Sequence, residues 1–168
     1  MSVSMCFYQD QTIKYGRTTE PLEASHRLLF IRHGAATVNG QTLATGEFAY
    51  SSEAISLQAA ADWSEIWRWE ISKPHVPFNL LKGDGILSRP KLSRVITTVP
   101  VEPGTDWLFR LDQITSAPGR VTPRHQHLGP GIRCLYQGTF NVEDQNHTIA
   151  DIGPSDSWWK SGVETVVA

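Results

Sequence analysis

Cysteine, long apolar runs and an excess of charge of one sign are what this 168-residue sequence lacks. Its two cysteines, Cys6 and Cys134, lie far apart and outside any CxxC spacing, which argues against a disulfide scaffold and a cysteine-based zinc knot. The longest apolar stretches, such as residues 27–31, are too short to span a bilayer, and residues 1–10 lack the features of a signal peptide. We therefore expect a cytoplasmic protein with reduced cysteines.

The charges of the chain nearly balance. The 15 Lys and Arg residues face 17 Asp and Glu residues, which gives a formal net charge of -2. This balance offers no electrostatic basis for binding nucleic acid or an anionic membrane. With 40% hydrophobic and 19% charged residues, the composition is that of a folded globular protein and excludes intrinsic disorder.

Glycine and proline interrupt the chain frequently. Thirteen glycines and ten prolines separate short apolar runs, and hardly any run keeps the i, i+3, i+4, i+7 spacing of an amphipathic helix. Many short runs between turn residues are typical of a β-sandwich or a β-barrel. The sequence therefore predicts an all-β fold, with strand candidates at residues 5–8, 27–32, 36–38, 55–58, 66–71, 94–99, 107–114, 132–136, 139–142 and 163–167.

A segment rich in Pro and Gly, residues 73–90, lies near the middle of the chain and has the composition of a linker. The sequences on its two sides resemble each other. An apolar run, a glycine, a shorter run and a turn occur around Gly34 and again around Gly138, 104 residues later. We interpret this as an internal repeat, with a first unit at residues 1–72 and a second unit at residues 91–168.

The second unit contains the most informative motifs. Residues 118–138, which run from Pro-Gly through His125-Gln126-His127 to Gly138, resemble the first motif of the cupin superfamily. Residues 154–166 resemble the second cupin motif. Together with the repeat, this resemblance implies a bicupin: two antiparallel jelly-roll barrels, with a small-molecule pocket inside a barrel.

His125 and His127 are candidate metal ligands, because residues i and i+2 of a strand point to the same face. By the resemblance, a cupin site adds a glutamate and a third histidine, and three nitrogens with a carboxylate suit iron, manganese, nickel, copper or zinc. Those two positions fall near Gly131 and Thr165, and Glu164 could ligate only in a shifted register. Two alternatives stay open: a metal site, and a metal-free remnant held by hydrogen bonds.

Arg133 and two tryptophans complete the predicted site. Strand alternation turns Arg133 inward, where a guanidinium beside two histidines favours an anionic organic ligand such as a carboxylate. The alternative for Arg133 is an ordinary charge on the surface of a strand. We predict that Trp158 and Trp159 form the rim of this pocket.

The first unit has no histidine at the corresponding motif positions, which are Pro21 or Leu22, Glu23, Arg27 and a position near Leu57. We therefore expect it to have a structural role or a role in dimerisation. His75 and His147 fall in predicted turns and are expected to be solvated. Trp63, Trp67 and Trp69 indicate core packing or an interface.

The second unit also stops one strand short of the first. Residues 55–58 are followed by another strand candidate, residues 66–71, whereas none follows residues 163–167. An uncovered sheet edge invites association. Either the chain is truncated, or a partner chain or residues 5–8 cover this edge, and we predict a homodimer.

The predicted function is the binding of a small anionic organic molecule in the second unit, and the resemblance implies metal-dependent oxygenase, isomerase or lyase chemistry. The alternative is a catalytically silent, metal-free binding or regulatory module. A further alternative rests on Arg32-His33-Gly34, which resembles the start of histidine phosphatases, where the histidine accepts a phosphoryl group beside a clamping arginine. The short, turn-rich segments after Gly34 argue against the alternating helices and parallel strands of that fold.

Overall fold

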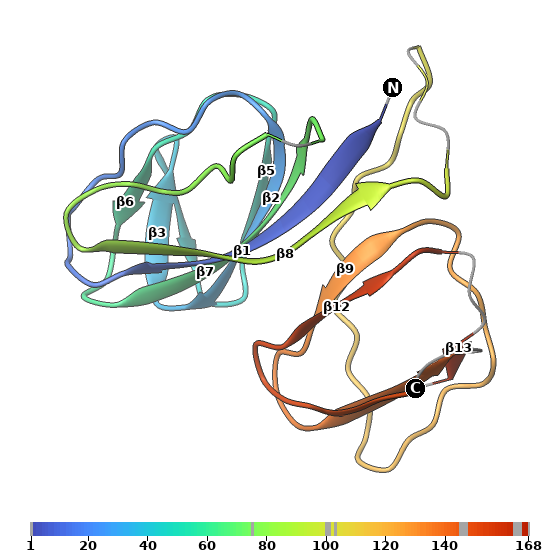
Figure 1. Cartoon of the computed structure of the whole chain (residues 1–168). Helices are drawn as coiled ribbons and strands as arrows, with labels where there is room; N and C mark the ends of the chain where they lie inside the picture. The colour runs from blue at the N-terminus through green and yellow to red at the C-terminus, as the bar shows by residue number, and fades with distance from the viewer. Residues whose placement is uncertain are drawn as a thin grey trace. The chain divides into compact units, whose positions relative to one another are not determined.

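The computed structural model describes residues 2–74, 76–99, 102, 104–144, 148–162 and 166–167. Thirteen β-strands and no helix occur in these segments, which confirms the all-β prediction (Figure 1). The strand pairings that we describe are all antiparallel. Over the same segments, no helix is long and apolar enough to cross a membrane.

The chain divides into two compact units, Val3–Val95 and Ile96–Ala168, here called the N-terminal and C-terminal units. The N-terminal unit has a five-stranded sheet in the order β5 (Phe48–Ser51), β2 (His26–His33), β7 (Ser64–Ser72), β1 (Val3–Thr12), β8 (Ile86–Ile96), and a three-stranded sheet in the order β4 (Gln41–Ala44), β3 (Ala35–Val38), β6 (Leu57–Ala59). The C-terminal unit has a three-stranded sheet in the order β11 (Thr148–Ile152), β10 (Phe140–Asp144), β13 (Val166–Val167), and a β12 (Ser157–Lys160) to β9 (Gly131–Cys134) pair.

The division between the units falls after Val95 and not within the expected linker at residues 73–90. Leu81 is only 4% exposed and belongs to the hydrophobic core of the N-terminal unit. Strand β8 begins at Ile86 and forms one edge of the five-stranded sheet. Pro90 resembles a linker residue in the sequence, but an edge strand tolerates proline because one side of it needs no ladder hydrogen bonds.

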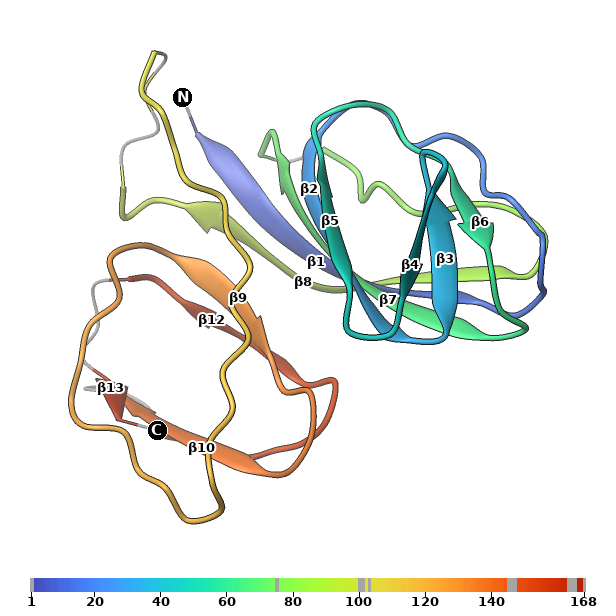
Figure 2. The same cartoon turned by 180° about the vertical axis from the view of Figure 1, so that it is seen from behind.

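The hydrophobic core of the N-terminal unit lies between its two sheets (Figures 1 and 2). Alternate residues of the paired strands contribute to it, and we call this side of the five-stranded sheet its inner face. Each fully buried aliphatic side chain contributes about 1.5–3 kcal/mol through the hydrophobic effect. The core residues are Leu22, Leu29, Ile31, Ala36, Val38, Leu43, Ile55, Leu57, Ile66 and Leu81.

Four charged side chains are buried on the same inner face. Arg27, Arg68, Asp10 and Glu70 are each at most 1% exposed. Arg27 Nη2 lies 2.7 Å from Glu70 Oε1, Arg68 Nη1 lies 2.5 Å from Glu70 Oε2, and Arg68 Nε lies 2.8 Å from Asp10 Oδ2. Two positive and two negative charges therefore balance within one network, and Ser88 donates a further hydrogen bond to Asp10.

Tyr8 and Asn79 pack against this network. The guanidinium carbon of Arg68 lies 3.9 Å from the centroid of the Tyr8 ring, and the Asn79 backbone N–H donates to the Tyr8 hydroxyl at 3.1 Å. Burial raises the pKa of the Tyr8 phenol, so it stays protonated. Desolvation lowers the pKa of Arg68, but the Asp10 and Glu70 carboxylates together outweigh it and leave that pKa raised. Each buried charge thus has a compensating partner.

The opposite face of the five-stranded sheet is aromatic. Phe7 contacts Trp69 and Trp67 with ring centroids 5.0 and 5.9 Å apart, and Phe30 contacts Trp67 at 6.1 Å. Trp67 and Trp69 share this face, as strand alternation predicts, whereas Trp63 is 42% exposed.

The two units repeat one order of strand pairings. The β5–β2 pair of the N-terminal unit has its counterpart in β12–β9, and the β4–β3–β6 sheet in β11–β10–β13. A bridge between Leu22 and Ile55 has its counterpart in a bridge between His125 and Val166. The internal similarity of the sequence is therefore matched by the strand pairings.

Candidate functional site

The sheet that carries His125 has an inner face defined by its neighbours. His125 forms a two-way backbone hydrogen-bonded pair with Val166, and Val166 is opposite Asp144 of β10. Residues directly opposite each other, or two apart on one strand, share a face. His125, the buried Val166 and Val142, and Phe140 therefore all point to the same side.

The β9–β12 pair faces this sheet within the C-terminal unit (Figures 1 and 2). It supplies an arginine and a tryptophan to the interior between them. The rings of Phe140 and Trp158 contact each other with centroids 5.8 Å apart, so Trp158 of β12 points toward the sheet that carries His125. Trp158 is opposite Arg133 of β9, and the two share that face. The structure thus turns Arg133 inward, onto the side where His125 lies.

The two histidines lie together. His125 and His127 are half-buried, the intervening Gln126 is exposed, and the two rings contact each other with centroids 4.9 Å apart at an angle of 86°. The carbonyl of Pro123 lies 2.8 Å from His125 Nδ1. Because a carbonyl can only accept, this hydrogen bond places a proton on Nδ1, so that Nε2 is the acceptor nitrogen when the ring is neutral.

Lys160 is a site residue that sequence reasoning missed. It lies two residues after Trp158 on β12, so it shares the inner face, and it is only 3% exposed. It is opposite Gly131, whose Cβ position would be 3.5 Å from Arg133 Nη1. Arg133 Nη1 also donates to the Gly131 carbonyl at 3.2 Å. Arg133 and Lys160 therefore share the inner face at the position of Gly131. The alternation of Trp158 and Lys160 along one strand was the signal in the sequence that could have identified Lys160.

Trp159 is not part of this arrangement, although the sequence predicted both tryptophans at the rim. Trp159 is opposite Ile132, and neighbouring residues of a strand point to opposite faces. Trp158 remains, and its indole N–H is buried without a hydrogen-bond acceptor in the part of the chain that the structure describes.

The donor groups decide whether a metal ion fits. Among the residues whose placement is described, no group of three or more His, Cys, Asp or Glu side chains could hold one. His125 and His127 supply half of the four ligands that the resemblance implies. Glu164 and Thr165, named as partners from the sequence, lie outside the described residues, as do His75 and His147. The described donors do not make a complete metal site.

The N-terminal unit holds no equivalent histidine pair. Leu22 occupies the bridge position that His125 occupies in the C-terminal unit, and it is buried in the hydrophobic core. Arg27 belongs to the buried charge network, and His26 points to the other face, where its Nδ1 lies 2.6 Å from the Tyr50 hydroxyl. At the positions that correspond to the histidine motif, the N-terminal unit therefore has a core residue, Leu22, and a buried ion-pair residue, Arg27, which are structural features.

The Arg32-His33-Gly34 segment lies at the end of β2. Its arginine lies over the Trp67 ring at 5.5 Å, and the His33 ring contacts the Trp63 ring at 4.4 Å. The strand pairings described above are antiparallel and the described segments contain no helix, so they do not provide the parallel α/β frame that a histidine phosphatase needs.

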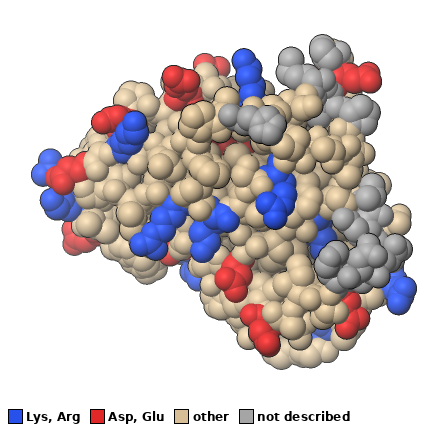
Figure 3. Space-filling view, in the orientation of Figure 1, with Lys and Arg blue, Asp and Glu red and all other residues tan. Residues whose placement is uncertain are grey.

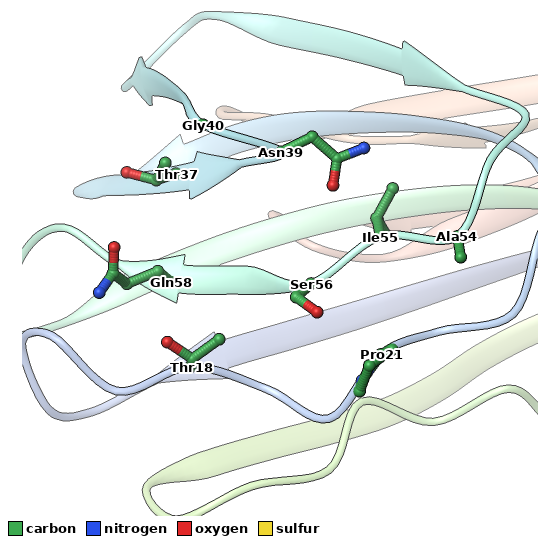
Figure 4. Close-up of a pocket in the computed structure, with 9 residues that line it drawn as sticks. All are labelled: Thr18, Pro21, Thr37, Asn39, Gly40, Ala54, Ile55, Ser56 and Gln58. Carbon is green, nitrogen blue, oxygen red and sulfur yellow. The ribbon is translucent and has the colours of Figure 1, made fainter.

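A hollow of about 350 Å³ lies on the N-terminal unit (Figure 4). Its lining is neutral throughout and contains no histidine, so it offers no charged group for pairing with an anion. The residues that line it are Thr18, Pro21, Thr37, Asn39, Gly40, Ala54, Ile55, Ser56 and Gln58. Charged side chains of both signs are scattered over the face of this unit that Figure 3 shows.

Comparison of the chain with protein-family models and with curated protein sequences finds no match.

Proposed function

We propose that the C-terminal unit is a cupin-type binding unit for a small organic anion, held between its two sheets by Arg133, Lys160, Trp158 and the His125–His127 pair. The observation that carries this proposal is that Arg133 and Lys160 share the inner face at Gly131: the Arg133 guanidinium lies beside this glycine, and Lys160 is opposite it on β12. Two cations on one face favour negative charge there, and a planar guanidinium suits a carboxylate.

The other donors of the inner face support the same ligand class. The buried Trp158 indole N–H can donate to a ligand oxygen, and a hydrogen bond that satisfies a buried donor is favourable. Protonation of His125 or His127 would add positive charge, whereas the neutral rings can accept from a ligand hydroxyl. The ligand that suits these groups is a carboxylate that also carries hydroxyl or carbonyl oxygens.

Neutralising Arg133 should weaken the binding of a dicarboxylate probe. We expect Arg133→Gln to reduce the affinity for succinate, measured by isothermal titration calorimetry, by about tenfold or more, because a charge-assisted hydrogen bond contributes about 1.5–3 kcal/mol. Arg94→Gln removes an exposed arginine of β8 and serves as the matched control with unchanged affinity. Equal affinities of the two variants, or no binding of succinate or inorganic phosphate by the intact chain, would contradict the proposal.

A metal-dependent enzyme of cupin type is the second candidate, and the orientation of His125 favours it. A histidine whose Nδ1–H is fixed by a carbonyl presents Nε2 in the way that metal-ligating histidines do.

Metal content separates the two candidates. If the second candidate holds, protein purified without affinity-tag metal should contain near-stoichiometric iron, manganese, nickel, copper or zinc, and the His125→Ala, His127→Ala double variant should contain less than a tenth of it. His26→Ala, which removes an exposed histidine of the N-terminal unit, should leave the content unchanged. Elemental analysis by mass spectrometry measures this, and metal-free protein with intact succinate binding would favour the silent binding module.

A further inference from the structure

The hollow of the N-terminal unit lies on the outer face of the three-stranded sheet, which is the face turned away from the hydrophobic core. Thr37 lies between two core residues of β3, and Gln58 lies between two buried residues of β6, so strand alternation turns both outward. Thr37 is directly opposite Gln58, and Thr18 forms a bridge with Gln58 on its other side. Three uncharged polar side chains therefore form a row across neighbouring segments of the chain.

Ser56 and Asn39 add a second set of polar groups to the hollow. Ser56 lies between two buried residues, so it also points outward. Asn39 and Gly40 form the two-residue turn between β3 and β4, and both have a positive φ, 46° and 84°, as a type I′ turn requires. This turn fixes the position of the Asn39 side chain, which Figure 4 shows directed across the hollow toward Ile55 and Ser56.

Hydrogen bonds hold two of these side chains in place. Thr37 Oγ1 lies 2.8 Å from Thr42 Oγ1, and the Gln58 side-chain amide donates to the Gly16 carbonyl at 3.4 Å. Side chains that are already ordered lose less conformational entropy when a ligand binds. The hollow therefore presents its polar groups in a preformed arrangement.

The chemistry of the lining selects a class of ligand. None of the nine described residues that line the hollow is charged or aromatic, so an anion, a cation or a stacked base has no specific partner there. The hydroxyl and amide side chains both donate and accept hydrogen bonds, as the hydroxyl groups of a sugar do. Pro21, Ala54 and Ile55 add apolar surface for the C–H groups of a sugar ring.

We propose that this hollow binds a neutral saccharide of one or two rings. Its volume of about 350 Å³ lies at the lower end of the range of about 300–1,000 Å³ that small-molecule sites cover. The N-terminal unit then has a binding role of its own, in place of the structural or dimerisation role expected from the sequence. This proposal does not depend on the proposed function, because it uses no residue of the C-terminal unit.

Titration of the ¹⁵N-labelled full chain with neutral sugars, followed by heteronuclear NMR, tests the proposal. Glucose, galactose and mannose are each added as the free sugar and as the methyl glycoside, up to about 50 mM, because we expect a dissociation constant of about 1–10 mM for a ligand without charge-assisted hydrogen bonds. At least one sugar should cause saturable shifts of the backbone amides that line the hollow, which are those of Thr18, Thr37, Gly40, Ser56 and Gln58. Binding of methyl glycosides as well as free sugars would extend the ligand to the end of a larger glycan.

Two variants each remove one polar group and are chosen to keep the local fold. Asn39→Gly removes the amide and retains a residue that adopts a positive φ, and Ser56→Ala removes one hydroxyl. Each should weaken sugar binding about fivefold, which is the effect of one neutral hydrogen bond. Gln41→Ala removes an exposed amide side chain next to the same turn but outside the hollow, and it serves as the matched control with unchanged affinity.

Three outcomes would overturn the proposal. The absence of saturable shifts with every sugar at about 50 mM would show that the hollow is an ordinary solvated surface. Saturable shifts confined to other residues would place the sugar elsewhere on the chain. Equal affinities of Asn39→Gly, Ser56→Ala and the intact chain would show that the polar groups of the hollow do not hold the sugar.

Discussion

Replacing Glu70 by glutamine should destabilise the N-terminal unit by about 3–5 kcal/mol, which is the cost of removing one partner from a buried ion-pair network. Glu70 accepts from Arg27 at 2.7 Å and from Arg68 at 2.5 Å, and all three side chains are at most 2% exposed. A glutamine of the same shape leaves one net positive charge in the interior, and its amide N–H group faces a guanidinium that can only donate. Urea unfolding followed by tryptophan fluorescence measures the loss.

Glu65→Gln is the matched control on the same strand. Glu65 is 8% exposed and accepts from the Gln9 side-chain amide at 3.0 Å and from the Trp67 indole at 2.8 Å, both on Oε1. These donors are neutral, and a glutamine oxygen can accept from both, so we expect a change within about 1 kcal/mol. Similar losses for the two variants would show that burial of the side chain, and not its charge, holds the network together.

The charge network shows where the sequence stops being informative about the fold. Alternation along β7 correctly groups Trp67 with Trp69, and therefore Arg68 with Glu70. It does not say which of the two faces is the inner one, and a charged face is normally the solvated one. Arg68 is buried because Asp10, 58 residues away in the chain, comes within hydrogen-bond distance across the sheet.

The same limit applies to strand boundaries. The all-β fold follows from local turn residues and short runs, so it could be predicted. Strand β8 could not be predicted, because Pro90 and the glycines before it are typical of a linker. Only the position of β8 at the edge of a sheet explains why a strand tolerates this proline. Residues 107–114 show the converse: their β-propensity is strong and yet they form no strand, because a strand also needs a neighbour to pair with.

The candidate site was predictable as far as strand alternation reaches. The i, i+2 spacing places His125 beside His127, and alternation turns Arg133 inward. The cross-strand register was not available from the sequence. It places Lys160 opposite Gly131, and it turns Trp159 away from the face that Trp158 occupies. Register depends on which strands pair, which a single sequence does not specify.

Gly162 connects this site to the fold and gives the second large expected effect. Its φ is +90°, and a Cβ at this position would lie 2.4 Å from the carbonyl carbon of Gly129. Gly129 follows His127 by two residues, and Gly162 follows Lys160 by two. The close approach of the two glycine backbones therefore joins the histidine segment to the end of β12.

We expect Gly162→Ala to destabilise the C-terminal unit by about 1–3 kcal/mol more than Gly138→Ala. Gly138 has φ +86° and no atom within 4 Å of its Cβ position, so it carries only the left-handed backbone penalty of about 1–2 kcal/mol. At Gly162 the same penalty adds to a backbone overlap, which costs about 1–3 kcal/mol or displaces the loop.

Displacement of this loop separates His125 and His127 from Arg133 and Lys160, so the affinity for succinate should fall together with stability. Equal stability losses in the two variants would mean that the Gly129 contact does not hold the site together. A larger stability loss in Gly162→Ala with unchanged succinate affinity would mean that the anion binds away from the histidine segment.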